Sequence, residues 1–216
     1  MGGAVDKRYS LGLMNHPLLP ALAISFQAPA KESDFDEALR LLKSEDHEIL
    51  IEEREPSGPF AGLEWLIPTA VIFFIGKAYV DGFVKEIGKD HYNLLKKALK
   101  TLWVKLVGPQ SPALTIIGTA GKVRASPEYS LLFSLLAEAP DGLRFKLLIR
   151  SYASQDEYQA TIDAFIDFLD AFHTGHLSPE LVAEMKEIRV VGKTLLLAYD
   201  RVAKRMRPVD PLADRP

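Results

Sequence analysis

The chain has 216 residues, 48% of them hydrophobic and 25% charged, and its formal net charge is −3. This composition is typical of a globular protein with a sizeable core, and it excludes a disordered or fibrous chain. The small negative charge gives no reason to expect nucleic-acid binding. The lack of cysteine excludes disulfides, thiolate catalysis and cysteine-type zinc sites.

Residues 1–20 are predicted to be an N-terminal extension and not a targeting signal. An apolar stretch, Leu18–Ser25, has the composition of a signal-peptide core, but Pro17 precedes it and Pro20 interrupts it. Asp6 stands where a myristoylation site requires Ser or Thr. We therefore expect a cytoplasmic protein, which also agrees with a chain free of cysteine.

The domain begins with a predicted β-α-β unit. Large apolar residues alternate with small or polar ones over Ala21–Ala28, which predicts a half-buried strand. Ser33 or Asp34 is then a suitable cap for a helix that continues to about Ser44. A second strand is predicted over His47–Arg54.

The segment Leu66–Gly76 is a run of eleven uncharged residues, and it has two interpretations. We predict that residues 62–87 are helical and that the apolar run is buried in the core. The run is too short for a transmembrane helix, which needs about twenty apolar residues, and Lys77 and Asp81 follow it. The alternative is a membrane-associated protein in which Trp65–Phe83 inserts shallowly.

A basic amphipathic helix is predicted over Lys89–Val107. Six lysines within Lys85–Lys105 stand against two acidic residues, a local balance of +4. Such a helix can bind a protein partner or an anionic membrane, or its lysines can face acidic residues of another helix. The candidate surface residues are Lys89, Lys96, Lys97, Lys100, Trp103 and Lys105, with Arg201, Lys204 and Arg205 near the end of the chain.

Five further elements are predicted in the second half of the chain, beginning with a strand over Ala113–Gly118. The segments Leu131–Ala137 and Leu143–Arg150 flank a Pro-Asp-Gly turn and are predicted to form a hairpin. Apolar residues recur at spacings of four and three over Gln155–His173, which predicts a helix packed on the core. The last helix is predicted over Pro179–Arg207.

These elements predict an α+β fold with a single mixed sheet of about five strands, in the chain order β-α-β-α-α-β-β-β-α-α, covered by helices. We expect one domain over residues 21–207 and a loose, proline-rich tail over residues 208–216.

Two weaker sites are suggested by residue type and spacing. An acidic column on the helix Gln155–His173 continues into a D-x2-H-x2-H pattern, whose residue types suit a metal ion. The column is Asp156, Asp163, Asp167 and Asp170, and the metal-ligand candidates are Asp170, His173 and His176. A glycine-containing segment follows the predicted strand Ala113–Gly118, and its backbone and basic side chains suit a phosphate. Its candidate residues are Gly118, Gly121, Lys122 and Arg124.

No serine-nucleophile elbow or zinc-protease motif is present, so no catalytic residue is predicted. The leading hypothesis is a non-enzymatic cytoplasmic protein that binds a macromolecular partner, most simply another protein, through its basic helix. The first alternative is a peripheral membrane protein that uses residues 65–107. The second is an enzyme or small-ligand protein with a metal or phosphate site. No cofactor is expected, and the sequence does not define the oligomeric state.

Overall fold

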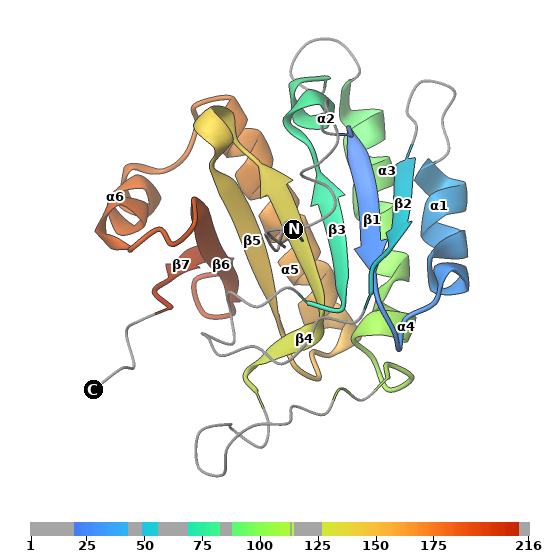
Figure 1. The fold of residues 1–216 in the computed structure, drawn as a ribbon. Helices are drawn as coiled ribbons and strands as arrows, with labels where there is room; N and C mark the ends of the chain where they lie inside the picture. The colour runs from blue at the N-terminus through green and yellow to red at the C-terminus, as the bar shows by residue number, and fades with distance from the viewer. Residues whose placement is uncertain are drawn as a thin grey trace, which may run out of the picture.

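The computed structural model describes residues 20–42, 49–55, 69–82, 88–112, 114 and 127–211. Within these residues, seven strands form one mixed sheet in the order β2-β1-β3-β4-β5-β6-β7, accompanied by six α-helices (Figure 1). The protein is therefore α+β with a single mixed sheet, as predicted. The sheet has two more strands than the five expected, and the order of the elements along the chain differs.

The strands are β1 Leu22–Phe26, β2 Ile49–Glu53, β3 Val71–Ile75, β4 Tyr129–Glu138, β5 Arg144–Arg150, β6 Thr194–Asp200 and β7 Arg205–Val209. The α-helices are α1 Asp36–Leu42, α2 Lys77–Gly82, α3 Gly88–Thr101, α4 Trp103–Leu106, α5 Gln155–His173 and α6 Pro179–Glu187. A short 3-10 helix, η2, precedes α1 over Glu32–Phe35, and a second, η5, forms the turn Pro140–Gly142.

The sheet is built from three parallel strand pairs, β1 with β2, β3 with β4, and β5 with β6. Each pair is joined by a helical crossover, because two parallel strands cannot be joined by a tight turn. Neighbouring pairs are antiparallel to each other. The predicted β-α-β unit at the start of the domain is thus confirmed, and so is the predicted hairpin, which is formed by β4 and β5.

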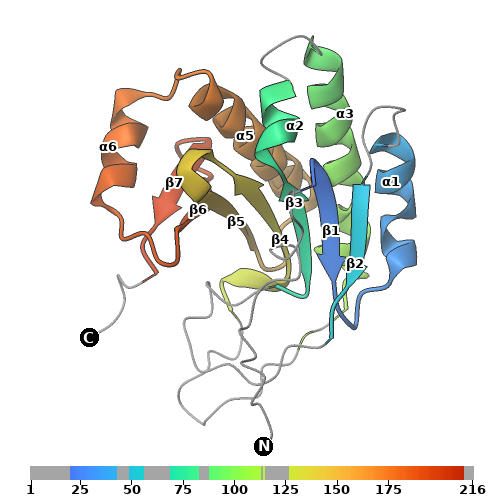
Figure 2. The ribbon, with the colours of Figure 1, turned by 45° about the horizontal axis from the view of Figure 1, so that its top comes forward.

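The helices lie on one face of the sheet, as Figures 1 and 2 show from two directions. We call this the helix-covered face. Its strand side chains pack with α1, α3 and α5 in one large apolar core. The strand residues at the centre of this core include Leu22, Ile24, Val71, Phe73, Phe133, Leu135, Phe145, Leu147, Leu195 and Leu197.

The opposite face, which we call the second face, is also buried in the five inner strands, β1, β3, β4, β5 and β6. Two smaller apolar clusters lie there, one around Phe74 and one around Leu196. This face also carries buried polar side chains, Ser25, Ser134 and Lys146. The prediction that β1 is half-buried is therefore wrong, since all five of its residues are buried.

The prediction of a helix over residues 62–87 is wrong for its apolar centre. Residues 71–75 form β3, whose five residues are all buried, and only Lys77–Gly82 is helical in the part described. A strand buried on both faces has no apolar–polar alternation, so its sequence resembles a buried helix. The β-branched and aromatic residues of this run favour the strand.

The predicted C-terminal helix is too long, because α6 ends at Glu187. The chain then turns through Gly192 and Lys193, both with positive φ, and continues as the strands β6 and β7. The apolar residues of β6 are buried on both faces and happen to continue the helical spacing of α6. Pro208 is accommodated because β7 is an edge strand, in which proline is tolerated.

Other predictions hold closely. The predicted helix Gln155–His173 is α5, and the side chain of Ser154 caps its first turn. The predicted basic helix is α3 followed by the short helix α4. The predicted strand Ala113–Gly118 lies outside the described residues apart from Leu114, which is in no strand.

Candidate functional site

The basic helix α3 packs on the sheet through an apolar stripe. Leu95, Ala98, Leu99 and Leu102 recur every three or four residues and are fully buried. This spacing places them on one side of the helix and turns the lysines away from the core. The amphipathic pattern that singled out this helix therefore serves, first of all, to dock it on the sheet.

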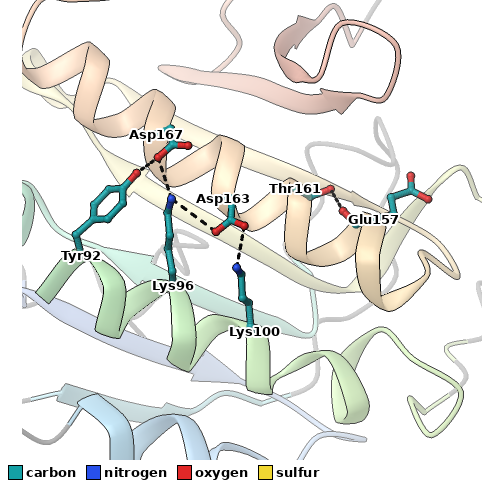
Figure 3. A network of polar contacts seen from close by, with 7 residues as sticks. All are labelled: Tyr92, Lys96, Lys100, Glu157, Thr161, Asp163 and Asp167. Carbon is teal, nitrogen blue, oxygen red and sulfur yellow. Dashed lines mark hydrogen bonds and ion pairs between the residues drawn. The ribbon is translucent and has the colours of Figure 1, made fainter. Parts of the chain in front are cut away.

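Two of the candidate lysines make ion pairs with α5 (Figure 3). Lys100 Nζ lies 2.8 Å from Asp163 Oδ2, and Lys96 Nζ lies 2.9 Å from Asp167 Oδ1 and 3.6 Å from Asp163 Oδ1. The hydroxyl of Tyr92 also donates to Asp167. The acidic column on α5 thus neutralises much of the positive charge of α3. An open groove of about 600 Å³ lies between the two helices at this network.

Burial favours the uncharged forms of the side chains in this network. It lowers the pKa of Lys96, and the attraction of Asp163 offsets this only in part. It raises the pKa of Asp167, and the neighbouring carboxylate of Asp170 adds to the effect. Partly desolvated pairs of this kind add little net stability, because the loss of hydration offsets the attraction. We infer that the network mainly fixes the register between α3 and α5.

The other candidate surface residues divide into engaged and exposed ones. Arg205 holds Glu184 of α6 through two nitrogens, at 2.5 and 3.0 Å. The half-buried indole of Trp103 donates from Nε1 to the carbonyl of Ala153, 3.1 Å away. Arg201 is mostly exposed and lies 3.5 Å from Glu157. The exposed side chains are Lys97, Lys105 and Lys204, while Lys89 lies in the first turn of α3.

Sequence analysis missed two apolar side chains at the end of the sheet where β5 and β6 finish. Tyr152 is 86% exposed and Val202 is 95% exposed. Leu148 of β5 pairs with Ala198 of β6, so each exposed residue lies four positions beyond a paired one on neighbouring parallel strands. The sequence signal was weak, because Val202 lies in a stretch with helical spacing and Tyr152 directly follows a strand.

The loops that carry these two residues are ordered turns. Asp200 Oδ1 accepts hydrogen bonds from the backbone amides of Val202 and Ala203, at 2.8 and 2.9 Å. Tyr152 has φ of 59°, a conformation that few non-glycine residues adopt. In the sequence, Asp200 is the signal for the turn that carries Val202, because an Asp side chain readily accepts hydrogen bonds from backbone amides a few residues further along.

The predicted metal ligands lie at the C-terminal end of α5. The carbonyl of Asp170 accepts from the amide of Thr174, the ring of His173 contacts Phe172, and His176 Nδ1 lies 3.0 Å from Thr174 Oγ1. Across the described ranges, no group of three or more His, Asp and Glu side chains is placed to hold a metal ion. The predicted phosphate residues, Gly118, Gly121, Lys122 and Arg124, lie outside the described residues.

The apolar run Leu66–Gly76 is described from residue 69 onward, and its strand residues lie inside the sheet. In the part of the chain that the structure describes, no helix combines the length and the apolar character that crossing a membrane requires.

Comparison with known proteins gives no match: no family model matches the chain, and no curated protein or solved structure is significantly similar to it.

Proposed function

We propose that the protein acts by binding another protein through the end of the sheet where β5 and β6 finish. The observation that carries this proposal is that two almost fully exposed side chains, Tyr152 and Val202, lie in the turns that follow the neighbouring strands β5 and β6. Exposed aromatic and aliphatic side chains that lie together are characteristic of interaction sites, whereas isolated ones are ordinary surface.

Basic residues from both regions singled out in the sequence belong to the segments that carry this pair or are tied to them. Arg201 and Lys204 flank Val202 in the β6–β7 turn. The exposed Val104 and Lys105 belong to α4, which is tied to the residue after Tyr152 by the Trp103–Ala153 hydrogen bond. We call this set the end surface, and its residues are Val104, Lys105, Tyr152, Arg201, Val202 and Lys204.

The charge of the end surface supports a protein partner over an anionic membrane. Glu157 lies 3.6 Å from Arg150 and 3.5 Å from Arg201 and so offsets part of their charge. Binding to anionic lipid relies on an excess of basic residues. The end surface combines apolar and basic groups and has Glu157 beside Arg201, which suits a partner that presents apolar and acidic side chains.

The rigidity of the turns supports the same proposal. Because Asp200 already fixes the backbone around Val202, little conformational entropy is lost when a partner binds. A partner with apolar side chains and one or more carboxylates would bury Tyr152 and Val202 and pair with Lys105 or Lys204.

Site-specific photocrosslinking in a lysate of the expressing cells tests the proposal. A photoreactive residue at position 152 is compared with one at position 190, where the partly exposed Val190 lies near the opposite end of β6. We expect a heterologous adduct at position 152 only. It should be lost in Val202→Asn and retained in Val190→Asn. Adducts of equal yield at both positions would contradict the proposal.

Two further outcomes would replace the protein partner with a different one. An adduct of twice the mass of the chain would make the end surface a contact between two copies. Salt-sensitive flotation with phosphatidylglycerol vesicles that is lost in Tyr152→Asn and Val202→Asn would make it a membrane-binding surface. Asn suits position 152, since it tolerates positive φ better than most residues do.

A further inference from the structure

The two edge strands of the sheet, β2 and β7, differ in their capacity to pair with a further strand. β7 contains Pro208, which has no amide proton to donate, and proline is one of the residues that protect an edge strand against further pairing. β2 contains no proline, and its register with β1 is regular over all five of its residues. In the part of the chain that the structure describes, no strand pairs with the outer side of β2.

The backbone of β2 directs the hydrogen-bonding groups of three residues away from β1. The amide of Arg54 donates to the carbonyl of Phe26, 2.6 Å away. Backbone groups alternate in direction along a strand, so the amides and carbonyls of Ile49, Ile51 and Glu53 are directed outward. All five side chains of β2 are partly or fully exposed, whereas those of the neighbouring β1 are buried. Solvent, and hence a partner, therefore reaches this edge.

The side chains of β2 offer apolar contacts at one end of the strand. Ile49 and Ile51 pack against the core of the helix-covered face, and Leu50 packs against the cluster around Phe74 on the second face. A strand added beside β2 would place its own side chains next to these residues on both faces, where cross-strand apolar pairs are stabilising.

The charge of this part of the chain is strongly negative. Residues 31–55 contain ten acidic and four basic residues, a formal charge of −6, against −3 for the whole chain. Within β2, burial lowers the pKa of Arg54 and the charge of Glu52 opposes this effect, so these two residues offset each other. The exposed carboxylates of Glu53 and Glu55 remain for a partner.

Further acidic side chains lie at the same end of the sheet. β1 and β2 are parallel, so the segment that leaves the carboxyl end of β1, η2 and the first turn of α1, begins at the end of the sheet where β2 finishes. Both views of the fold place α1 beside β2 (Figures 1 and 2). The exposed acidic residues of this segment are Glu32, Asp36 and Glu37, and the exposed basic ones that follow or precede them are Lys31 and Arg40.

We propose that the outer edge of β2 binds an extended segment of a basic partner protein, which adds a strand to the sheet. Apolar residues of that segment lie beside Ile49–Ile51, and lysine or arginine residues lie beside Glu53 and Glu55. Main-chain hydrogen bonds supply affinity in such complexes, and the neighbouring side chains supply specificity. A second copy of this chain is a poor partner, since two β2 edges repel each other and β7 contains Pro208. The β2 edge and the end surface involve different strands, so the proposal does not depend on the proposed function.

Selection from a phage-displayed library of short random peptides tests the proposal. The full chain is the bait, and Glu53→Pro is used for counterselection. We expect the selected peptides to be enriched in lysine and arginine and to alternate with apolar residues. N-methylation of one alternate set of amides in a selected peptide should weaken its binding about tenfold or more, and methylation of the other set should have little effect, because only one set faces β2. No peptide that distinguishes the two baits, no basic enrichment, or equal effects of the two methylated sets would overturn the proposal.

Two variants at one exposed position separate backbone from charge. Glu53→Pro removes an outward amide that β1 does not use and should weaken peptide binding about tenfold or more, whereas Glu53→Gln keeps the amide and should weaken it only several-fold. The methylated peptides test the same hydrogen bonds on the unchanged protein, which guards against failure of Glu53→Pro to fold. Equal effects of the two variants would overturn the backbone pairing. Sedimentation of the free chain as a dimer that is lost in Glu53→Pro would make the occupant a second copy and overturn the basic partner.

Discussion

The two faces of the sheet differ in where they place their polar groups. On the helix-covered face, the buried strand side chains are apolar, and the charged network of Lys96, Lys100, Asp163 and Asp167 lies on the outer side of the helices. On the second face, Ser25, Ser134 and Lys146 are buried among apolar residues of the strands themselves.

We infer that the polar groups have a structural role on the helix-covered face and a functional role on the second face. Charges outside the helix layer remain partly hydrated and cost little, whereas a buried lysine or an unpaired hydroxyl lowers stability. Sequences that keep such groups in a sheet do so against the tendency of cores to be apolar. The second face is therefore where we expect chemistry, and the helix-covered face is where we expect stability.

The largest expected effect compares two adjacent phenylalanines of β3. Phe73 lies in the large core of the helix-covered face, and Phe74 lies in the small cluster of the second face. Phe73→Ala should lower the free energy of unfolding by about 4 kcal/mol, and Phe74→Ala should lower it by about 3 kcal/mol. Urea unfolding followed by circular dichroism measures both. An equal or larger loss for Phe74→Ala would show that the two faces are packed alike.

The next effect concerns Lys146, which is 7% exposed and whose cross-strand neighbours are Leu136 and Leu196. Burial lowers its pKa from 10.5 to about 8. The folded state therefore binds fewer protons than the unfolded state between these values, and stability should rise with pH across them, by about 2 kcal/mol between pH 7 and pH 9.5.

Lys146→Met removes the buried charge and should abolish this rise while increasing stability at pH 7 by up to roughly 3 kcal/mol. Urea unfolding at pH 7 and pH 9.5 measures both effects and stays below the range in which the buried tyrosines titrate, since burial raises the pKa of Tyr79 to about 12. A variant that keeps the wild-type pH dependence would show that Lys146 is not the titrating group.

The helix-covered layer was largely predictable from sequence, because its signals are local. The apolar spacing of Tyr158, Ile162 and Phe165 predicted α5, and Ser154 caps it. The alternation in β5 and the Pro-Asp-Gly turn predicted the hairpin with β4. In α5 the apolar spacing and the burial have the same period, whereas β5 was predicted from its alternation and its turn although both of its faces are buried.

The central strands and the buried serines of the second face were not predictable in this way. The residues of β3 and β6 are buried on both faces, so their runs lack the alternation that distinguishes a strand from a helix. The row of polar residues Ser25 and Ser134 depends on long-range pairing, since the two serines are more than one hundred positions apart and share a face only through the order of the strands. No local pattern contains that order.

A smaller effect distinguishes the two buried serines of the second face. Ser134 forms a hydrogen bond with Thr69, so Ser134→Ala should lower the free energy of unfolding by about 1 kcal/mol. Ser25 has an unpaired hydroxyl, so Ser25→Ala should leave the protein as stable or raise its stability by up to about 1 kcal/mol. Thermal or urea unfolding measures both. A destabilised Ser25→Ala would mean that the hydroxyl already has a partner in the folded protein.

The smallest effect concerns the ion pair between Lys100 and Asp163 on the outer side of the helices. Both side chains are partly exposed, so a double-mutant cycle with Lys100→Met and Asp163→Asn should give a coupling of about 0.5 kcal/mol that decreases in 0.5 M salt. The cycle tests the comparison between the two faces. A small coupling for this exposed pair and a large effect at Lys146 would show that burial determines how much a charged side chain changes the free energy of unfolding. A salt-independent coupling of about 2 kcal/mol or more would contradict it, since the outer network would then behave as a buried one.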